Sequence, residues 1–370
     1  MHMKYVYLMI VSIILFGCAM TKTINQKEVL MNEDRLIFHF EFVDALLQWL
    51  KGSDEVCIDY IVGLPATQFM QQIIYQNVSN EIPSFKEILK RFDPKDDLVD
   101  DIYVLRKAYE SQSNIKSLLY ELRNKEFTKG IYERVIRYFP VGYTPPRNYD
   151  VFFSGAGWHW GDAHAFRYVV NDGKYVLSGE GIPAIMFNLT LVSDFYGDNT
   201  EARINNMIDT MAHELFHAIF FDAMKYYWPS WDNGNFNNKI LWLIMNEGIA
   251  HLIMNSERLL QKYKTDDNLK GREIQAFATL NEYAKLLFND KIEFNQRREA
   301  AMKGVAGDQW SRYLCIAGMF MAFQIEKHHG NEGIRDTIKN GPIYFLNKYN
   351  SIQKSNTELP ELPIEIIKLI

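Results

Sequence analysis

Apolar residues recur at helical spacing over the first third of the chain. Steps of three and four residues separate Phe38, Phe42, Leu46, Leu47 and Leu50. This spacing places the apolar side chains on one face of a helix, so helices are predicted over about 31–140.

Helical spacing returns from residue 200 onward. Asp198, Asn199 and Thr200 are candidate N-caps. An apolar stripe follows at Ile204, Ile208, Met211, Leu215 and Ile219. Three more helices are predicted over about 239–257, 273–288 and 310–328, and Gly330 would end the last one.

Between these helical parts, residues 150–196 carry the pattern of a small sheet. Residues 151–153 predict a short strand, and 168–177 predict a hairpin that turns at Asp172-Gly173. The apolar run 185–192 predicts a further strand. The order helical, β, helical therefore predicts a mostly helical α+β protein.

The N-terminus resembles a secretory signal. Lys4 precedes an uncharged run, 5–16, which is too short to span a hydrocarbon core of about 30 Å as a helix. The run ends in Gly17-Cys18, which resembles a lipobox, so Cys18 is predicted to carry a lipid. Because Ala19 is not an inner-membrane retention signal, the expected location is the cell envelope, anchored to the outer membrane. A signal cut nearby and an uncleaved anchor remain alternatives.

Composition limits the partners and the covalent chemistry. A net charge of −6 offers no basic excess to neutralise phosphates, so nucleic acid is not an expected partner. Cys57 and Cys315 lie far apart and do not form a disulfide framework, and Cys315 fits a small core residue. The expected organisation is a signal peptide over 1–18, a helical region over 19–145 and a catalytic region over 146–370, with the sheet at 150–196 and helices at 200–340.

The segment His213-Glu214-Leu215-Phe216-His217 carries the clearest chemistry. Residues i and i+4 of a helix lie on one face, so both imidazoles can reach one metal ion. Glu214 is offset from this line and can hold a water molecule instead. The surrounding residues are apolar, and three ionisable groups in a buried helix need a compensating partner. A metal ion would supply it.

A catalytic zinc site needs a third protein ligand. Asn246-Glu247-Gly248 lies in the next predicted helix, which is otherwise very apolar. We expect Glu247 to complete the ligand set, and a buried salt bridge is the alternative role for its carboxylate. His251, one turn further on, could bond to Glu247 or replace it as the ligand.

The His213-Glu214-x-x-His217 motif with Asn246-Glu247-Gly248 downstream resembles the gluzincin clan of zinc peptidases. The chain is also similar to little-characterised bacterial families of zinc-dependent peptidases. The resemblance implies a small sheet packed on a thermolysin-like pair of zinc-binding helices. A longer gap than in thermolysin or aminopeptidase N indicates an extra loop over about 222–238. Metzincins are excluded, because Phe220 and Ala223 replace their Gly and His.

The resemblance implies hydrolysis of peptide bonds in a peptide or protein substrate. A zinc-bound water would attack the carbonyl, with Glu214 as the general base. Gluzincins often supply one more donor to the oxyanion from a later helix, and Tyr313 is the expected donor, with Tyr283 and His251 as rivals.

Several other residues have a possible place in the site. Asp209 and Asp222 could orient the imidazoles. Residues 155–164 resemble a substrate-facing loop, within which His159 and His164 are a weaker candidate for a second metal site. Because gluzincins often bind peptide on a sheet edge, the strand 185–192 is the predicted edge.

Two other functions fit the same sequence. One is hydrolysis of a non-peptide amide on the same zinc site, and the other is a zinc-binding envelope lipoprotein without turnover. Glu214 favours an enzyme, because a structural zinc site needs no general base.

Overall fold

A computed structural model describes residues 35–53, 56–77, 82–95, 101–123, 126–158, 162–232, 234–263 and 265–370. The chain divides into two compact units. The first, the sheet unit, contains the described residues before Glu133 together with Arg147–Ala218. The second, the helical unit, contains Glu133–Pro146 and Ile219–Ile370.

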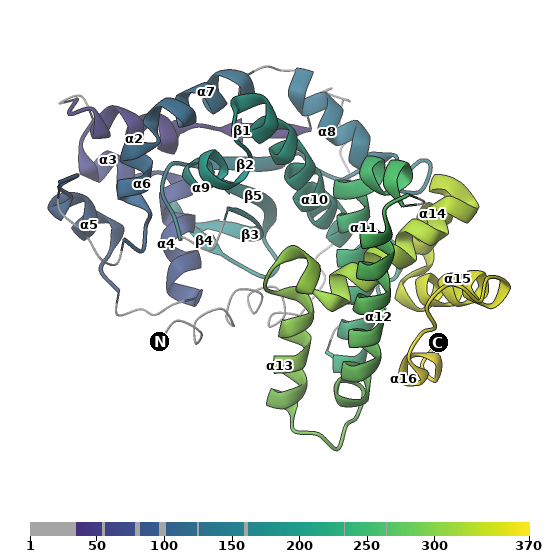
Figure 1. Cartoon of the computed structure of the whole chain (residues 1–370). Coiled ribbons are helices and arrows are strands. Elements are labelled where there is room, and N and C mark those ends of the chain that lie inside the picture. The colour runs from purple at the N-terminus through teal and green to yellow at the C-terminus, as the bar shows by residue number, and fades with distance from the viewer. Residues whose placement is uncertain are drawn as a thin grey trace. The chain divides into compact units, whose positions relative to one another are not determined.

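The sheet unit is built on a mixed sheet, which has five strands among the described residues. Its strands are β1 (Leu36–His39), β2 (Tyr149–Ser154), β3 (Ala163–Asn171), β4 (Lys174–Leu177) and β5 (Ile182–Asn188). Their order is β1-β2-β5-β3-β4, with β2 parallel to both β1 and β5, and β3 antiparallel to both β5 and β4 (Figure 1). The edges of this sheet are therefore β1 and β4.

The predicted hairpin forms as expected. Asn171 pairs with Lys174, and the two residues between them turn the chain with positive φ, 48° at Asp172 and 75° at Gly173. This left-handed pair matches the twist of the flanking strands, which explains why an Asp-Gly sequence lies here.

The strand predicted over 185–192 is wrong in its extent and in its place. β5 ends at Asn188, whose side chain accepts a hydrogen bond from the amide of Thr190 at 3.1 Å and caps helix α9 (Leu189–Phe195). A short apolar run fits a buried strand and a buried helix equally well, so periodicity did not separate them. β5 also lies between β2 and β3, so it is not an edge to which a peptide could add.

The sheet unit also contains helices besides α9. They are α2 (Glu41–Leu50), α3 (Ile58–Gly63), α4 (Pro65–Asn77), α5 (Phe85–Arg91), α6 (Leu105–Glu110), α7 (Gln112–Leu122), the first part of α8 (Glu126–Ile136) and the first part of α10 (Thr200–Tyr227). α4 packs on β2 and β4, and α2 packs on β2 (Figure 1). The helical interpretation of 31–140 missed β1, because four residues are too few for alternation to be visible.

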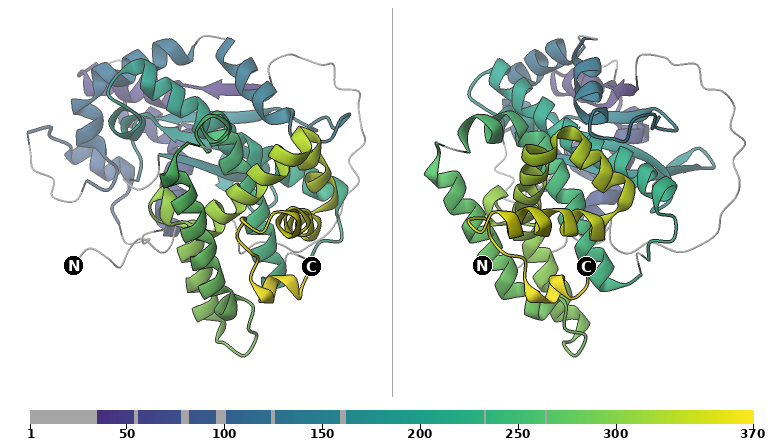
Figure 2. Two further views of the ribbon diagram at one scale, coloured as in Figure 1. Left: turned by 45° about the vertical axis from the view of Figure 1, so that its right-hand side comes forward. Right: turned by 90° about the vertical axis from the view of Figure 1, so that its right-hand side faces the viewer.

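The helical unit contains the C-terminal helices of the chain. They are α11 (Phe236–Lys262), α12 (Asp267–Leu287), α13 (Phe294–Val305), α14 (Tyr313–Asn340), α15 (Pro342–Ser355) and α16 (Ile364–Ile367), with a 3-10 turn, η1 (Gln309–Ser311), before α14. α14 packs against α11, α12, α13 and α15 and forms the centre of the unit. Figure 1 shows α12 and α13 as an antiparallel hairpin, and Figure 2 shows α15 and α16 at the end of the chain.

The predicted helices of the second half all form, with shifted ends. The helix that begins near residue 200 is α10 (Thr200–Tyr227), and Asn199 caps it by accepting from the amide of Ala202 at 2.9 Å. Gly330, the predicted stop, has φ 62° and ψ −166°, a non-helical conformation that separates two helical segments within α14. The chain is thus a mostly helical α+β protein with a small sheet, as predicted. Within its described part, no helix has the length and apolar character that crossing a membrane requires.

Candidate metal centre

Helix α10 positions the His213-Glu214-x-x-His217 motif. The helix buries Met211, Leu215 and Ile219 of the predicted apolar stripe, whereas Ile204 and Ile208 are partly exposed. His213 is buried, and Glu214 and His217 are partly exposed. The motif therefore lies at the boundary between the buried face of α10 and the face that meets solvent.

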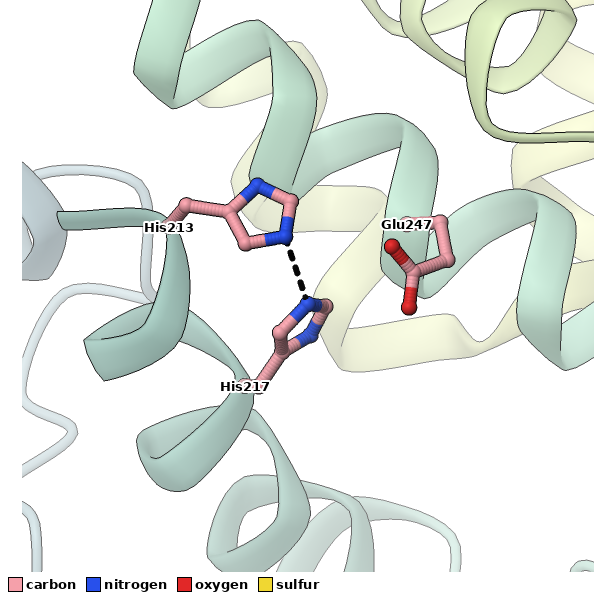
Figure 3. Close-up of side chains that lie close together, drawn as sticks. All are labelled: His213, His217 and Glu247. Atoms are coloured by element: carbon pink, nitrogen blue, oxygen red, sulfur yellow. Dashed lines mark hydrogen bonds between the residues drawn. The ribbon is translucent and has the colours of Figure 1, made fainter. Parts of the chain in front are cut away.

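The two imidazoles of the motif approach each other directly. Nε2 of His213 lies 3.0 Å from Nε2 of His217, and the ring planes cross at 87° (Figure 3). Two ring nitrogens at this distance can share a single hydrogen atom, so one ring donates and the other accepts. The i, i+4 spacing has thus placed two nitrogen donor atoms at one point.

Glu247, the predicted third ligand, lies in α11 of the helical unit, whereas His213 and His217 lie on the part of α10 that belongs to the sheet unit. The side chain of Glu247 is 19% exposed, so its carboxylate is partly open to solvent. Its place in one ligand set with the two histidines stays a prediction.

These residues fit zinc by donor type and by spacing. Two imidazole nitrogens and one carboxylate oxygen are a ligand set of catalytic zinc sites, which leave a fourth position open. Tetrahedral zinc with bonds of about 2.0–2.2 Å separates its donors by roughly 3.3–3.6 Å. The 3.0 Å between the two Nε2 atoms is close to this range, and small ring rotations would reach it.

The buried side chain of Tyr196 interacts electrostatically with Glu214. The hydroxyl of Tyr196 donates to Oδ2 of Asp162 at 2.6 Å, and the backbone of Tyr196 accepts from Asn206 of α10 at 2.6 Å. Burial raises the pKa of Tyr196 well above its usual value, and the negative charges of Asp162 and Glu214 raise it further. Tyr196 therefore remains a neutral donor near the base of the motif.

A second set of donor side chains surrounds Glu247 within the helical unit. Oε2 of Glu247 lies 3.8 Å from Sγ of Cys315 and 3.8 Å from Nδ1 of His251. Both neighbours are buried. Burial raises the pKa of the Cys315 thiol well above its usual value, and the charge of Glu247 adds to this effect. The thiol is thus protonated in the metal-free chain and can donate to Glu247.

Tyr313, the predicted oxyanion donor, is engaged elsewhere. Its hydroxyl donates to the carbonyl oxygen of Ala300 in α13 at 2.8 Å, and its ring stacks on Tyr283 with centroids 5.0 Å apart. The side chain is buried. Tyr283 and Tyr313 thus form one packing pair, and the oxyanion role stays a prediction for both. His251, the third candidate, lies beside Glu247.

The structure leaves the remaining sequence predictions open. Asp222 is buried and Asp209 is partly exposed, and their role as orienting partners stays a prediction. His159 and Cys18 lie outside the described residues, so neither the second metal pair with His164 nor the lipid anchor can be placed. Burial lowers the pKa of His164, which favours its neutral form.

The sequence predicts the residues of the motif, but it does not predict the contacts that Cys315 and Tyr196 make near the candidate ligands and base. Cys315 was interpreted as a core residue, and it is buried, but its thiol also meets the Glu247 carboxylate. Tyr196 was not singled out. For Cys315, a sequence signal existed: a small polarisable residue at the start of a helix that is otherwise apolar. No local signal pointed to Tyr196.

Comparisons with known proteins bear on these donor sets. A family model described as "Putative zinc dependent peptidase (DUF5700)" matches residues 61–358. Neither the curated proteins nor the solved structures gave a match. The match covers the motif of α10, Glu247 of α11 and most of both units, and zinc suits the donor sets that the structure contains. The chain therefore belongs to this zinc-dependent peptidase family.

Proposed function

We propose that the protein is a zinc peptidase in which His213, His217 and Glu247 hold the metal and Glu214 is the general base. The observation that carries the proposal is the pair of Nε2 atoms 3.0 Å apart on α10, with Glu214 adjacent to His213 in the sequence. Glu247 is included because a carboxylate in the otherwise apolar middle of α11 supplies the third ligand that a catalytic zinc site needs. The family description supports the peptidase class.

The chemistry divides between the metal and the chain. When bound, zinc supplies Lewis acidity, which makes water acidic enough to ionise near neutral pH and polarises a carbonyl group. Glu214 accepts the proton of the attacking water and returns it to the leaving amine, so a single carboxylate acts as base and then as acid. Its partial exposure lets water and substrate reach it.

The proposal includes a donor to the oxyanion, and the sequence suggests Tyr313 for this role. The role that the sequence suggests for Tyr313 requires its hydroxyl to leave the Ala300 carbonyl, to which it now donates. A donor that stabilises an oxyanion must point at the position where charge develops. Tyr313→Phe tests this role, because the substitution removes only the hydroxyl group.

The Glu214→Gln variant tests the proposal. Removing a general base lowers turnover by about 10²- to 10⁴-fold, and the amide keeps the size of the side chain. We expect kcat on a peptide library to fall by this factor while the zinc content stays at the wild-type level. Glu201→Gln is the matched control, because Glu201 is exposed in the first turn of the same helix. Wild-type turnover in the Glu214→Gln chain would contradict the role of Glu214 as the general base, and a wild-type chain that binds zinc without turnover would favour a zinc-binding protein without catalysis.

A substrate panel separates the two enzymatic functions. The library should contain peptides and non-peptide amides of similar size. Cleavage confined to the second group would assign the same zinc chemistry to an amidase. Cleavage of peptides supports the family description.

We further propose a lipid anchor at Cys18 and a place in the cell envelope. The support is the short apolar run that ends in Gly17-Cys18. Incorporation of labelled fatty acid into the wild-type chain and its loss in Cys18→Ser would support the anchor. Equal labelling of the two chains would exclude it.

A further inference from the structure

We propose that Glu247, His251 and Cys315 form a second cation site, which takes a borderline or soft divalent metal such as zinc. Glu247 is also a ligand in the proposed catalytic zinc site, so the two sites share this one residue. The inference rests on the proposed function only in this respect. All three residues belong to the helical unit. Nothing in the description of the family assigns such a site.

Two helices in direct contact bring the three side chains together. Glu247 and His251 are one turn apart on α11, so they project from the same face. Cys315 is in the first turn of α14, and α11 and α14 pack against each other. His251 is 2% exposed and Cys315 is 1% exposed, so two polar side chains are enclosed here by an apolar core. In the structure His251 bonds to the main-chain carbonyl oxygen of Glu247, and the Cys315 thiol donates to the Glu247 carboxylate.

The distances between the donor atoms suit a metal ion. One donor atom of each residue lies within 4.8 Å of the other two, and Oε2 of Glu247 is 3.8 Å from Sγ of Cys315. Bonds of about 2.0 Å to oxygen or nitrogen and about 2.3 Å to sulfur place tetrahedral donors roughly 3.3–3.6 Å apart. For the Glu247–Cys315 pair, a contraction of a few tenths of an ångström would reach this range.

The hydrogen bond of His251 prepares its ring for this role. Nδ1 lies 2.9 Å from the main-chain carbonyl oxygen of Glu247 and donates its hydrogen to it. With the hydrogen held on Nδ1, the lone pair is on Nε2. Metal-binding histidines commonly donate their other N–H to a carbonyl in this way, which fixes the tautomer and the ring.

The donor types select the class of metal. A thiolate, an imidazole and a carboxylate together suit zinc, cobalt or cadmium and disfavour magnesium and calcium, which prefer oxygen ligands. On binding, the sulfur of Cys315 gives up its proton to solvent and bonds to the metal. Glu247 can then bridge two cations, because a carboxylate offers two oxygens. Without a cation, the thiol donates to Glu247, as it does in the structure.

Cobalt titration of the full chain tests the second site. The protein is freed of metal with a chelator and titrated with Co²⁺, while bound cobalt is counted by elemental analysis and thiolate-to-cobalt charge transfer is followed by absorbance. We expect two equivalents per chain and a charge-transfer band. Cys315→Ser should lose the band and one equivalent, and His251→Ala should lose the same equivalent. Cys57→Ser is the matched control, because Cys57 is an exposed free thiol.

The outcomes separate this inference from the proposed function. His213→Ala should lose one equivalent and keep the charge-transfer band. A wild-type chain that binds cobalt without the band would overturn the second site and leave the first intact. If His213→Ala keeps both the charge-transfer band and the wild-type number of bound cobalt ions, the second site is supported. The same result would contradict the ligand set of the proposed function. Circular dichroism of each variant shows whether a lost equivalent reflects lost folding, and Cys315→Ala repeats the test with a smaller change in polarity.

Discussion

Gly248 and Gly318 bring α11 and α14 into backbone contact, next to the residues that surround Glu247. A Cβ atom on Gly318 would overlap the carbonyl oxygen of Ile244 and lie 3.0 Å from Cα of Gly248, and a Cβ on Gly248 would overlap the backbone of Gly318. Only glycine permits this approach. Because Glu247 precedes Gly248 and Cys315 lies one turn before Gly318, the contact sets the distance between their side chains.

Gly318→Ala tests this contact. The added methyl group must separate two helices that meet through backbone atoms, and such overpacking costs about 1–3 kcal/mol. We expect the free energy of unfolding, measured with urea, to fall by this amount. Gly271→Ala is the matched control in α12, where an added Cβ meets nothing within 4 Å. The control should stabilise the chain by about 0.5–1 kcal/mol, since alanine suits a helix interior. Equal effects of the two substitutions would show that the backbone contact is unimportant.

Removal of zinc should lower the stability of the folded chain. A ligand that binds only the folded state, present at about 100 to 1,000 times its Kd, stabilises that state by about 2.7–4.1 kcal/mol. We expect a chelator to lower the unfolding midpoint of the wild-type chain, and the shift should shrink in His217→Ala. His328→Ala is the control, because His328 is an exposed histidine of α14. An unchanged shift in His217→Ala would argue against His217 as a ligand.

Tyr313→Phe separates a structural role of Tyr313 from a catalytic one. The Tyr313 hydroxyl donates to the Ala300 carbonyl. Removing a buried hydrogen bond costs about 1 kcal/mol of stability, while removing an oxyanion donor lowers kcat by about 10²- to 10³-fold. From the observed bond we expect the loss of stability with near wild-type kcat. A fall in kcat of that size at unchanged KM would instead support the oxyanion role that the sequence suggests. Tyr283→Phe serves as the comparison, because its ring stacks on Tyr313.

Stability should fall as pH rises above the normal pKa of a glutamate, because of Glu273. This carboxyl is buried, accepts a hydrogen bond from the Tyr263 hydroxyl, and has its pKa raised from 4.5 by burial. A raised folded pKa favours the neutral form, so its stabilisation is complete below about pH 4.5 and is lost as pH rises through the folded pKa. Each unit of difference corresponds to about 1.4 kcal/mol.

Glu273→Gln isolates this effect, because its amide is neutral at every pH. The wild type should lose stability as pH rises above about 4.5, whereas Glu273→Gln should not lose this contribution. The free energy of unfolding of the variant minus that of the wild type should therefore increase with pH, and urea titrations at several pH values measure this difference. Glu282→Gln, at an exposed position of α12, is the control and should track the wild type. A constant difference between Glu273→Gln and the wild type across this range would contradict the prediction.

The sequence by itself determined the local features of this protein. The i, i+4 spacing of His213 and His217 sufficed to place both rings on one helix face, and Asp172-Gly173 sufficed to turn the hairpin. Asn199 capped α10 as its residue type predicts. In each case the interacting atoms are a few residues apart, so the geometry of one helix or one turn fixes them.

Tertiary structure alone decided which distant residues meet. It placed β5 in the middle of the sheet, ended that strand at Asn188, tied the Tyr313 hydroxyl to Ala300 and brought Cys315 to Glu247. Periodicity assigns a side chain to the buried face of its own helix or strand, but it says nothing about the element that covers that face. The partner is chosen by packing across large separations in sequence, such as the close contact of α11 and α14 at two glycines.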